Sequence, residues 1–382
     1  MQRPTRSHSE GAHRRHVAAW AIALVAAATA VSLIARFVER DQGPFEPFST
    51  DSYYRTPVTG WPVDPRSAGW IGSIRRWIRD PAHRNDDWVL LTAAPGGLAR
   101  SGRPVYWVTG HGAEFRIDCR GTLCPPQLAS FLRHHETLRL PTDRSGHGPR
   151  PGAGVDRSLA LFDLRDRVVI GLHGVWYRGH VLHADGGDIY AVRSGGIAAS
   201  WAAVTSDSDR SNGGHRGFPS AFGQVRYDEV AWATSRSPVR PIPHALELFV
   251  PPVTGLLHCF PLTQGEARTS APVAPPEGLR IRIRPDVDLS ALHGAALVLA
   301  KTLQTYGAIL ADTSGNDAVD LSLEGLSQEN VRSPGAPAAW PSRGPLALSR
   351  DALRPIPFDP QHWEVLRAGW LPGSDRAVPC ST

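Results

Sequence analysis

The stretch RGHVLHADGGDIYAV, residues 178–192, indicates the fold class of this chain. It is a strand-like run that breaks at a pair of glycines, and a second such run, PIPHALELFV, occupies residues 241–250. The polar segment SDSDRSNGGHRGFPSAFGQVRYDEV, residues 206–230, lies between them. Together these segments hold four of the chain's sixteen histidines. We therefore expect strands here, and we expect any functional site within residues 178–250.

Similar short runs surround this stretch and extend the strand pattern outward. They are rich in β-branched and aromatic residues and are separated by Gly, Pro, Asp or Arg: WVLLTA (88–93), PVYWVTG (104–110), EFRID (114–118), SLALFDL (158–164) and RVVIGL (167–172). The chain also has 37 Gly and 34 Pro and a single lysine, Lys301, which disfavours a helical bundle. The sequence predicts a mainly β fold, with a sandwich or jelly-roll-like body.

Two or three peripheral helices are expected around this body. Residues 67–80 place their apolar side chains on one helical face, and Pro81 stands just beyond the end. A shorter helix is expected at residues 127–135. A longer one is expected at residues 290–306, where Gly307 is a suitable stop.

The N-terminal region predicts a membrane anchor. Residues 1–16 form a basic tail, and residues 17–35 are 19 residues without a charge, about the length that spans a bilayer as a helix. The arginines before this stretch predict a cytoplasmic N-terminus. Residues 36–65 then read as a linker, and residues 66–382 as an extracytoplasmic β-rich domain. The alternative is secretion after cleavage of a signal peptide near the small residues Ala28-Thr29-Ala30.

The distribution of charge argues against nucleic acid as a partner. The whole chain carries a net charge of +5. Residues 1–40 hold six arginines against two glutamates, a net charge of +4, which leaves about +1 for residues 41–382. A nearly neutral body lacks the basic surface that phosphate binding requires. The expected partners are the cell membrane, through the N-terminal helix, and a polysaccharide.

The four cysteines form an even set, which suits disulfides in an exported protein. We expect Cys119–Cys124 as a local clip and Cys259–Cys380 as a tie for the C-terminal tail. A zinc site is the weaker alternative, because the chain has no C-x-x-C pair.

Three residues of the first strand-like run are candidates for chemistry. Because side chains alternate along a strand, His183 and Asp185 share one face and His180 lies on the other. His183 with Asp185 suits a base held by a carboxylate, or two ligands of a metal. The alternative is a strand end with a turn acid before the glycines. His244, ahead of the second run, suits a general acid/base or a structural histidine bonded to a carbonyl.

The segment VRYDEV supplies candidate ligand-binding charges in Arg226, Asp228 and Glu229, with a charged helix start as the alternative. A glycosidase would need two carboxylates about 5–10 Å apart. DSDRSNGG resembles a calcium loop, but Phe218 stands where the bidentate Glu belongs. No nucleotide-binding, hydrolase or metalloprotease motif is present, so neither a metal nor a cofactor is predicted.

The pieces VRYDEV…PHALEL and TYGAILAD resemble an uncharacterised family of secreted, strand-rich actinobacterial proteins, over most of residues 48–318. The resemblance implies an exported domain, sometimes found beside carbohydrate-related modules. The chain departs from the family pattern at Arg178, where the family has an acid. The expected function is a membrane-anchored extracytoplasmic protein that binds or processes cell-envelope polysaccharide. The alternative is a non-catalytic structural or protein-interaction module of the envelope.

Overall fold

A computed structural model describes residues 44–381, except 84–85, 96–101, 144, 155, 199–214, 253, 267, 272, 316, 327–335 and 375. The compact body begins at Phe45. Among the described residues, no helix is both long enough and apolar enough to cross a membrane. The predicted anchor at residues 17–35 lies outside the described residues, as does the DSDRSNGG segment.

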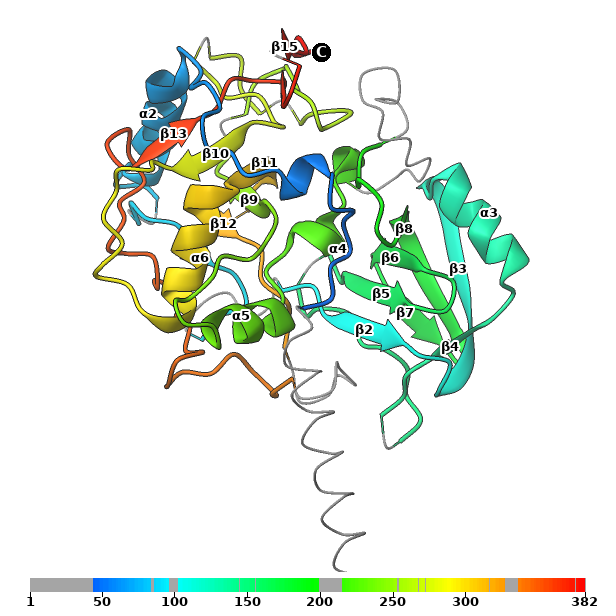
Figure 1. Ribbon diagram of the computed structural model, residues 1–382. Helices are drawn as coiled ribbons and strands as arrows, with labels where there is room; N and C mark the ends of the chain where they lie inside the picture. The colour runs from blue at the N-terminus through cyan, green and yellow to red at the C-terminus, as the bar shows by residue number, and fades with distance from the viewer. Residues whose placement is uncertain are drawn as a thin grey trace, which may run out of the picture. The chain divides into compact units, whose positions relative to one another are not determined.

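The first sheet of the body has six strands and a helical cover (Figure 1). Its strands, in spatial order, are β1 (Leu90–Leu91), β12 (Asp320–Leu321), β9 (Leu246–Val250), β11 (Ala308–Thr313), β10 (Arg280–Ile283) and β13 (Trp363–Val365). Alternate side chains of β9, such as Leu246 and Leu248, share one apolar cluster with three helices: α2 (Ser67–Ile78), α5 (Tyr227–Thr234) and α6 (Gly294–Thr305). One face of this sheet is therefore covered by helices.

The second sheet has seven strands and is the one that contains residues 178–192 (Figure 1). Its strands are β2 (Val105–Val108), β5 (Leu159–Asp163), β6 (Val168–His173), β8 (Val181–Ala191), β3 (Ala113–Leu123) and β4 (Leu138–Leu140), with β7 (Trp176–Arg178) paired to β8. Helix α3 (Pro126–His134) packs on one face, where Leu128 joins a cluster with Ile170 and Leu182. The opposite face turns toward the first sheet.

A third cluster lies between the two sheets. Phe162 and Tyr190 come from the seven-stranded sheet, and Ala245 and Ile309 come from the region of β9 and β11. The short helix α4 (Ser220–Gly223) contributes Phe222 to the same cluster. The layers therefore run from helices to the first sheet, the inter-sheet core, the second sheet and α3.

An irregular segment, residues 45–58, which we term the strap, fills much of this inter-sheet core. Its Pro47 carbonyl accepts from the N–H of Arg193 beyond β8, and its Tyr54 carbonyl accepts from the N–H of Ala245 before β9. The sequence suggests these residues as part of a linker. In the structure they belong to the compact body, because Phe48, Tyr53 and Tyr54 are buried there.

Three buried arginines satisfy carbonyl groups of the strap. Arg280 on β10 donates to the carbonyl oxygens of Tyr53, Tyr54 and Thr56 at 2.8, 3.3 and 3.0 Å. Arg282, two residues on, donates to the Val58 carbonyl at 2.6 Å. Arg226, ahead of α5, donates to the Phe45 carbonyl. Side chains thus supply the donors that a regular ladder would supply to a strand.

The mainly β fold is confirmed, with 15 strands among the described residues. These residues also form five α-helices, where two or three were expected. Four strand pairs are parallel, so both sheets are mixed and depart from the antiparallel pairing of a jelly roll. The last two strands, β14 (Trp370–Leu371) and β15 (Arg376–Ala377), form a separate hairpin.

The three predicted helices are present as α2, α3 and α6. The apolar face of α2 is buried as its periodicity predicts, through Trp70, Ile71 and Ile74. Gly307 follows α6 with φ +69°, a left-handed conformation that favours glycine and ends the helix where expected.

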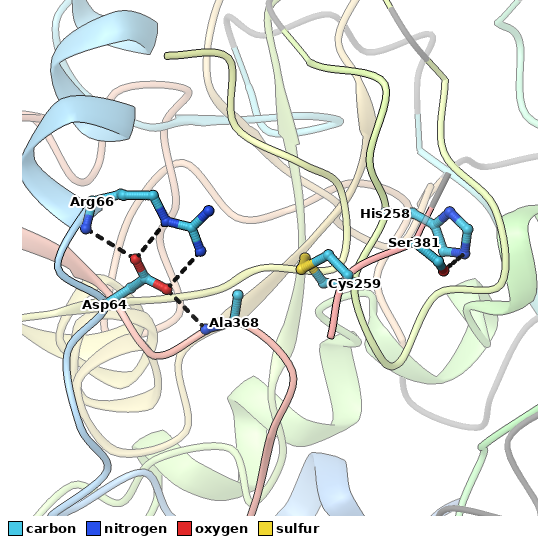
Figure 2. The surroundings of a disulfide bond; sticks show 7 residues. Asp64, Arg66, His258, Cys259, Ala368 and Ser381 are labelled. Carbon is cyan, nitrogen blue, oxygen red and sulfur yellow. Dashed lines mark hydrogen bonds and ion pairs between the residues drawn. A yellow bond between two sulfur atoms is a disulfide. The ribbon is translucent and has the colours of Figure 1, made fainter. Parts of the chain in front are cut away.

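Both predicted disulfides are present, Cys119–Cys124 and Cys259–Cys380. Figure 2 shows the second bond, which ties the C-terminal tail to the buried Cys259. Next to it, the backbones of His258 and Ser381 exchange hydrogen bonds at 2.8 and 2.9 Å. A second tie to the C-terminal region lies at Asp64, whose Oδ2 accepts from the Ala368 N–H at 3.2 Å.

We expect the two disulfides to contribute unequally to stability, because a cross-link that closes a longer loop removes more entropy from the unfolded chain. The Cys259Ser/Cys380Ser variant, which opens a separation of 121 residues, should lose about 5 kcal/mol of unfolding free energy. The Cys119Ser/Cys124Ser variant, with a separation of 5 residues, should lose about 2 kcal/mol. Urea unfolding of the oxidised proteins measures both losses, and equal losses would contradict this expectation.

Candidate functional site

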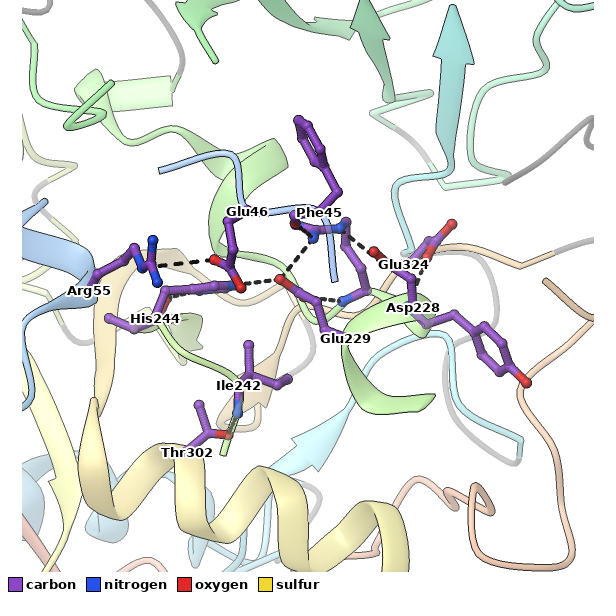
Figure 3. Close-up of polar contacts among 12 residues, drawn as sticks. Phe45, Glu46, Arg55, Asp228, Glu229, Ile242, His244, Thr302 and Glu324 are labelled. Carbon is purple, nitrogen blue, oxygen red and sulfur yellow. Dashed lines mark hydrogen bonds and ion pairs between the residues drawn. The ribbon is translucent and has the colours of Figure 1, made fainter. Parts of the chain in front are cut away.

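Four of the seven predicted site residues come together between α5 and β9 (Figure 3). Glu229 is at their centre. Its Oε1 lies 2.8 Å from His244 Nε2 and 2.9 Å from Arg226 Nη2. Arg226 Nε donates to Asp228 Oδ1 at 3.1 Å. We term these four residues the buried ion cluster.

The local sequence explains how the cluster forms. Arg226 is the residue before the first turn of α5, and its backbone N–H donates to Glu229 Oε2 at 3.0 Å. A glutamate at this third helical position commonly returns to the cap in this way. Asp228 and Glu229 also place negative charge at the positive end of the helix dipole. The predicted alternative for VRYDEV, a charged helix start, is therefore what the structure shows.

The strap completes the cluster from the other side. Two charged side chains of the strap, Glu46 and Arg55, form an ion pair that is longer than those of the cluster, with Glu46 Oε2 3.9 Å from Arg55 Nε (Figure 3). Burial raises the pKa of Glu46, an effect that nearby His244 counters and Glu229 reinforces. Phe48 packs its ring edge-on to His244, with centroids 5.4 Å apart. The strap therefore covers the histidine with both a charged and an aromatic side chain.

Three members of the buried ion cluster are sealed from solvent, and the fourth, Asp228, has a side chain that is 30% exposed. His244 and Glu229 are 0% exposed and Arg226 is 1% exposed. Burial alone would lower the pKa of His244, but the Glu229 carboxylate beside it raises that pKa above its usual value. Burial alone would raise the pKa of Glu229, but Arg226 and His244 hold it below its usual value. The arrangement thus favours the charged form of both partners.

A sealed, fully paired histidine has a structural role. His244 uses its second ring nitrogen, Nδ1, on the carbonyl oxygen of Ala245 at 2.9 Å. Both ring nitrogens are then engaged, and no exposed face remains for a substrate. General acid–base catalysis requires hydrogen-bond reach to the reacting proton. The structural alternative for His244 is therefore the one that the geometry supports.

The other three predicted residues lie apart from the cluster, on or beside β8 of the seven-stranded sheet. The carboxylate beside His183 is that of Asp118, with Oδ2 3.1 Å from Nδ1, and not that of Asp185. Asp118 lies directly across the parallel β3–β8 pair, whereas residues i and i+2 of one strand are about 6.8 Å apart. His180 is exposed, with Nδ1 3.2 Å from the Glu114 carbonyl oxygen.

A buried acid pair that the sequence did not reveal faces the inter-sheet core. Asp188 on β8 accepts from the Gly171 N–H at 3.0 Å. A side chain at position 171 would collide with that carboxylate, so glycine admits it there. Glu247 projects from β9, with Oε2 4.0 Å from Arg103 Nη1. The sequence signal was a single acid in each of two otherwise apolar runs, DIYAV and LELFV.

Both acids of this pair are less acidic than usual. Burial raises the pKa of Asp188 to about 6, against an opposing effect of Arg103. Burial also raises the pKa of Glu247, an effect that Arg103 and the Ser220 and Ser322 hydroxyl groups oppose. Raised carboxyl pKa values are typical of catalytic acids and also of structural ion networks.

Metal binding has no support from these groups. In the part of the chain that the structure describes, no group of three or more His, Cys, Asp or Glu side chains is arranged to hold a metal ion. All four cysteines are in disulfides, which removes the zinc alternative.

Removing His244 should strongly destabilise the protein. His244→Ala leaves Glu229 buried without one of its two charged partners, a change that typically costs about 3–5 kcal/mol. His180→Ala removes an exposed histidine and should cost about 0.5 kcal/mol or less. Urea unfolding of both variants measures the difference. Equal stability of the two variants would show that the buried ion cluster contributes nothing specific.

The stability of the wild type should fall relative to Asp188→Asn as pH rises. A folded-state pKa of about 6, against 3.8 for an ordinary aspartate, means that the folded protein favours the protonated carboxyl. The protonated Asp188 carboxyl therefore stabilises the folded protein. This stabilisation is fully present below pH 3.8 and is lost as the pH rises through 6, and the free energy of unfolding then falls by about 3 kcal/mol. Asparagine keeps an oxygen for the Gly171 N–H and does not titrate.

The measurement is urea unfolding of both proteins between pH 4 and pH 8, with Asp185→Asn on the same strand as the matched control. Parallel stability curves for the wild type and Asp188→Asn would mean that Asp188 titrates as an ordinary carboxyl in the folded protein.

Similarity to known proteins does not assign a function to these residues. No protein-family model matches the chain. No curated protein and no solved structure matches it either. Function must be inferred from the side chains themselves.

Proposed function

We propose that this protein is an extracytoplasmic module, held at the cell membrane by an N-terminal helix, that binds cell-envelope polysaccharide without converting it. The uncharged stretch at residues 17–35 supports the location. The two disulfides also support it, because such bonds persist in oxidising compartments. Membership of the secreted actinobacterial family that the sequence resembles is part of the same proposal.

The observation that carries the non-catalytic part is that the predicted enzyme residues are not brought together. His244 and Arg226 are buried and paired with Glu229 beneath the strap, whereas His183 and Asp185 lie apart from them on β8. The ion pairs of Arg226 and His244 with Glu229 join the start of α5 to the segment before β9, and Arg226 also binds the strap. A substrate could reach them only if the strap left the inter-sheet core.

Binding is favoured over a purely structural role by an exposed aromatic side chain. Trp176 on β7 is 41% exposed at the edge of the seven-stranded sheet. Tryptophan and tyrosine side chains are enriched at recognition surfaces. The seven-stranded sheet packs against the first sheet through the inter-sheet core, so the surface around Trp176 has a rigid support.

The proposal is tested with the full-length protein in detergent and an insoluble envelope polysaccharide prepared from an actinobacterium. We expect saturable co-sedimentation with the polysaccharide and no release of reducing ends during the incubation. Cellulose serves as the control matrix. Absence of binding would overturn the proposal. Release of reducing ends would also overturn it, and Asp188→Asn and Glu247→Gln would then show whether the inter-sheet acids are responsible.

A further inference from the structure

One face at the edge of the seven-stranded sheet gathers aromatic and basic side chains. Strands β7, β8 and β3 run side by side there (Figure 1). The strand register aligns Trp176 with His183 and His183 with Asp118. The next row aligns Arg178 with Val181 and Val181 with Arg116. Side chains directly opposite each other in a sheet lie on the same face, so these six residues share one face.

The first row holds the Trp176 ring in a fixed position. The ring stacks on His183 with centroids 3.9 Å apart and an interplanar angle of 13°. His183 is fixed in turn by the Asp118 carboxylate, 3.1 Å from its Nδ1. One face of the indole is therefore covered, and the exposed surface of Trp176 belongs to the other face and the ring edge. A fixed aromatic surface binds a ligand with little loss of conformational entropy.

The second row supplies positive charge beside this ring. Arg116 and Arg178 are both exposed, and neither guanidinium forms an ion pair within the described chain. They stand on either side of Val181, two strand spacings or about 10 Å apart. Arginine side chains are long enough to converge across such a gap, and their planar guanidinium groups match a carboxylate.

The acids that flank Arg116 on β3 are paired with other basic side chains. Glu114, two residues before Arg116 on the same face, is paired with Arg139 at 2.8 Å. Asp118 is paired with Arg120 and His183. Asp185 is exposed on β8, two residues beyond His183 and four beyond Val181. An anionic ligand would therefore be attracted at the Arg116–Arg178 end of the face and repelled at the Asp185 end. This polarity sets one orientation for a ligand that carries both a ring and an acid.

We propose that Trp176, Arg116 and Arg178 form a binding subsite for an acidic sugar unit, whose ring stacks on the exposed indole face and whose carboxylate lies between the two guanidinium groups. The proposal rests on the proposed function, because it names the class of polysaccharide that the module binds. His183 and Asp118 are positioning residues in this subsite, since they hold the tryptophan.

The probe for this subsite is a galacturonate oligosaccharide, and the matched probe is the same oligosaccharide with its carboxylates methyl-esterified. Titration calorimetry with the full-length protein should show that the acid binds about tenfold more tightly than the ester. The Arg116Gln/Arg178Gln variant should remove that preference. Trp176→Ala should weaken both ligands about tenfold, with partial retention in Trp176→Phe.

Arg133→Gln is the control variant, because Arg133 is an exposed arginine of α3, which packs with Leu182 on the other face of β8, and it should bind like the wild type. Equal binding of acid and ester by the wild type would overturn the acidic class. Wild-type affinity in Trp176→Ala would overturn the subsite. In either case co-sedimentation with envelope polysaccharide would remain, whereas failure of the proposed function would remove it.

Discussion

A segment outside the sheets and long helices can lie inside a protein only if its carbonyl groups find donors. The strap is such a segment, and its one regular element is a short 3-10 helix at Tyr53–Arg55. The strap meets this condition through three buried arginines, Arg226, Arg280 and Arg282. Each guanidinium carries several donors in a fixed plane, so one side chain can serve two or three neighbouring carbonyls. The inter-sheet core depends on this substitution, because without it the space between the sheets would contain unpaired peptide groups.

The same constraint explains why acidic and basic side chains are concentrated around the strap. Arg280 binds carbonyl oxygens, whereas the other two buried guanidinium groups also pair with carboxylates, and Arg226 has Asp228 and Glu229 beside it. Glu229 in turn retains His244. Arg282 is matched in the same way by Glu364, at 2.7 Å. The sequence presents Arg226, Glu229 and His244 as reactive residues. In the structure they form a series of ion pairs, and the first member, Arg226, binds a carbonyl oxygen of the strap.

Local features of the fold could be predicted from the sequence, and contacts between distant residues could not. The strand runs and the apolar face of α2 follow from side-chain periodicity, which neighbouring residues determine. The partner of His183 is Asp118, 65 positions earlier in the chain, and only the parallel pairing of β3 with β8 brings it there. The burial of His244 depends on a strap almost 200 residues away, so its structural role was invisible in PIPHALELFV. The aromatic residues of the strap were the one available sign that it belongs to the core.

The long span of these contacts also sets an order on folding. The Phe45 carbonyl accepts a hydrogen bond from Arg226, 181 residues later in the chain. The Ser67 hydroxyl accepts one from the backbone N–H of Val365, 298 residues later. Contacts of such high sequence separation slow folding, because the chain must close large loops before it gains their energy. The strap is synthesised before β10, yet its carbonyl groups bind Arg280 and Arg282 of that strand, 227 and 224 residues later. The nascent chain therefore carries this aromatic segment unprotected until β10 has been synthesised, and such exposed hydrophobic surface makes a folding chain prone to aggregation.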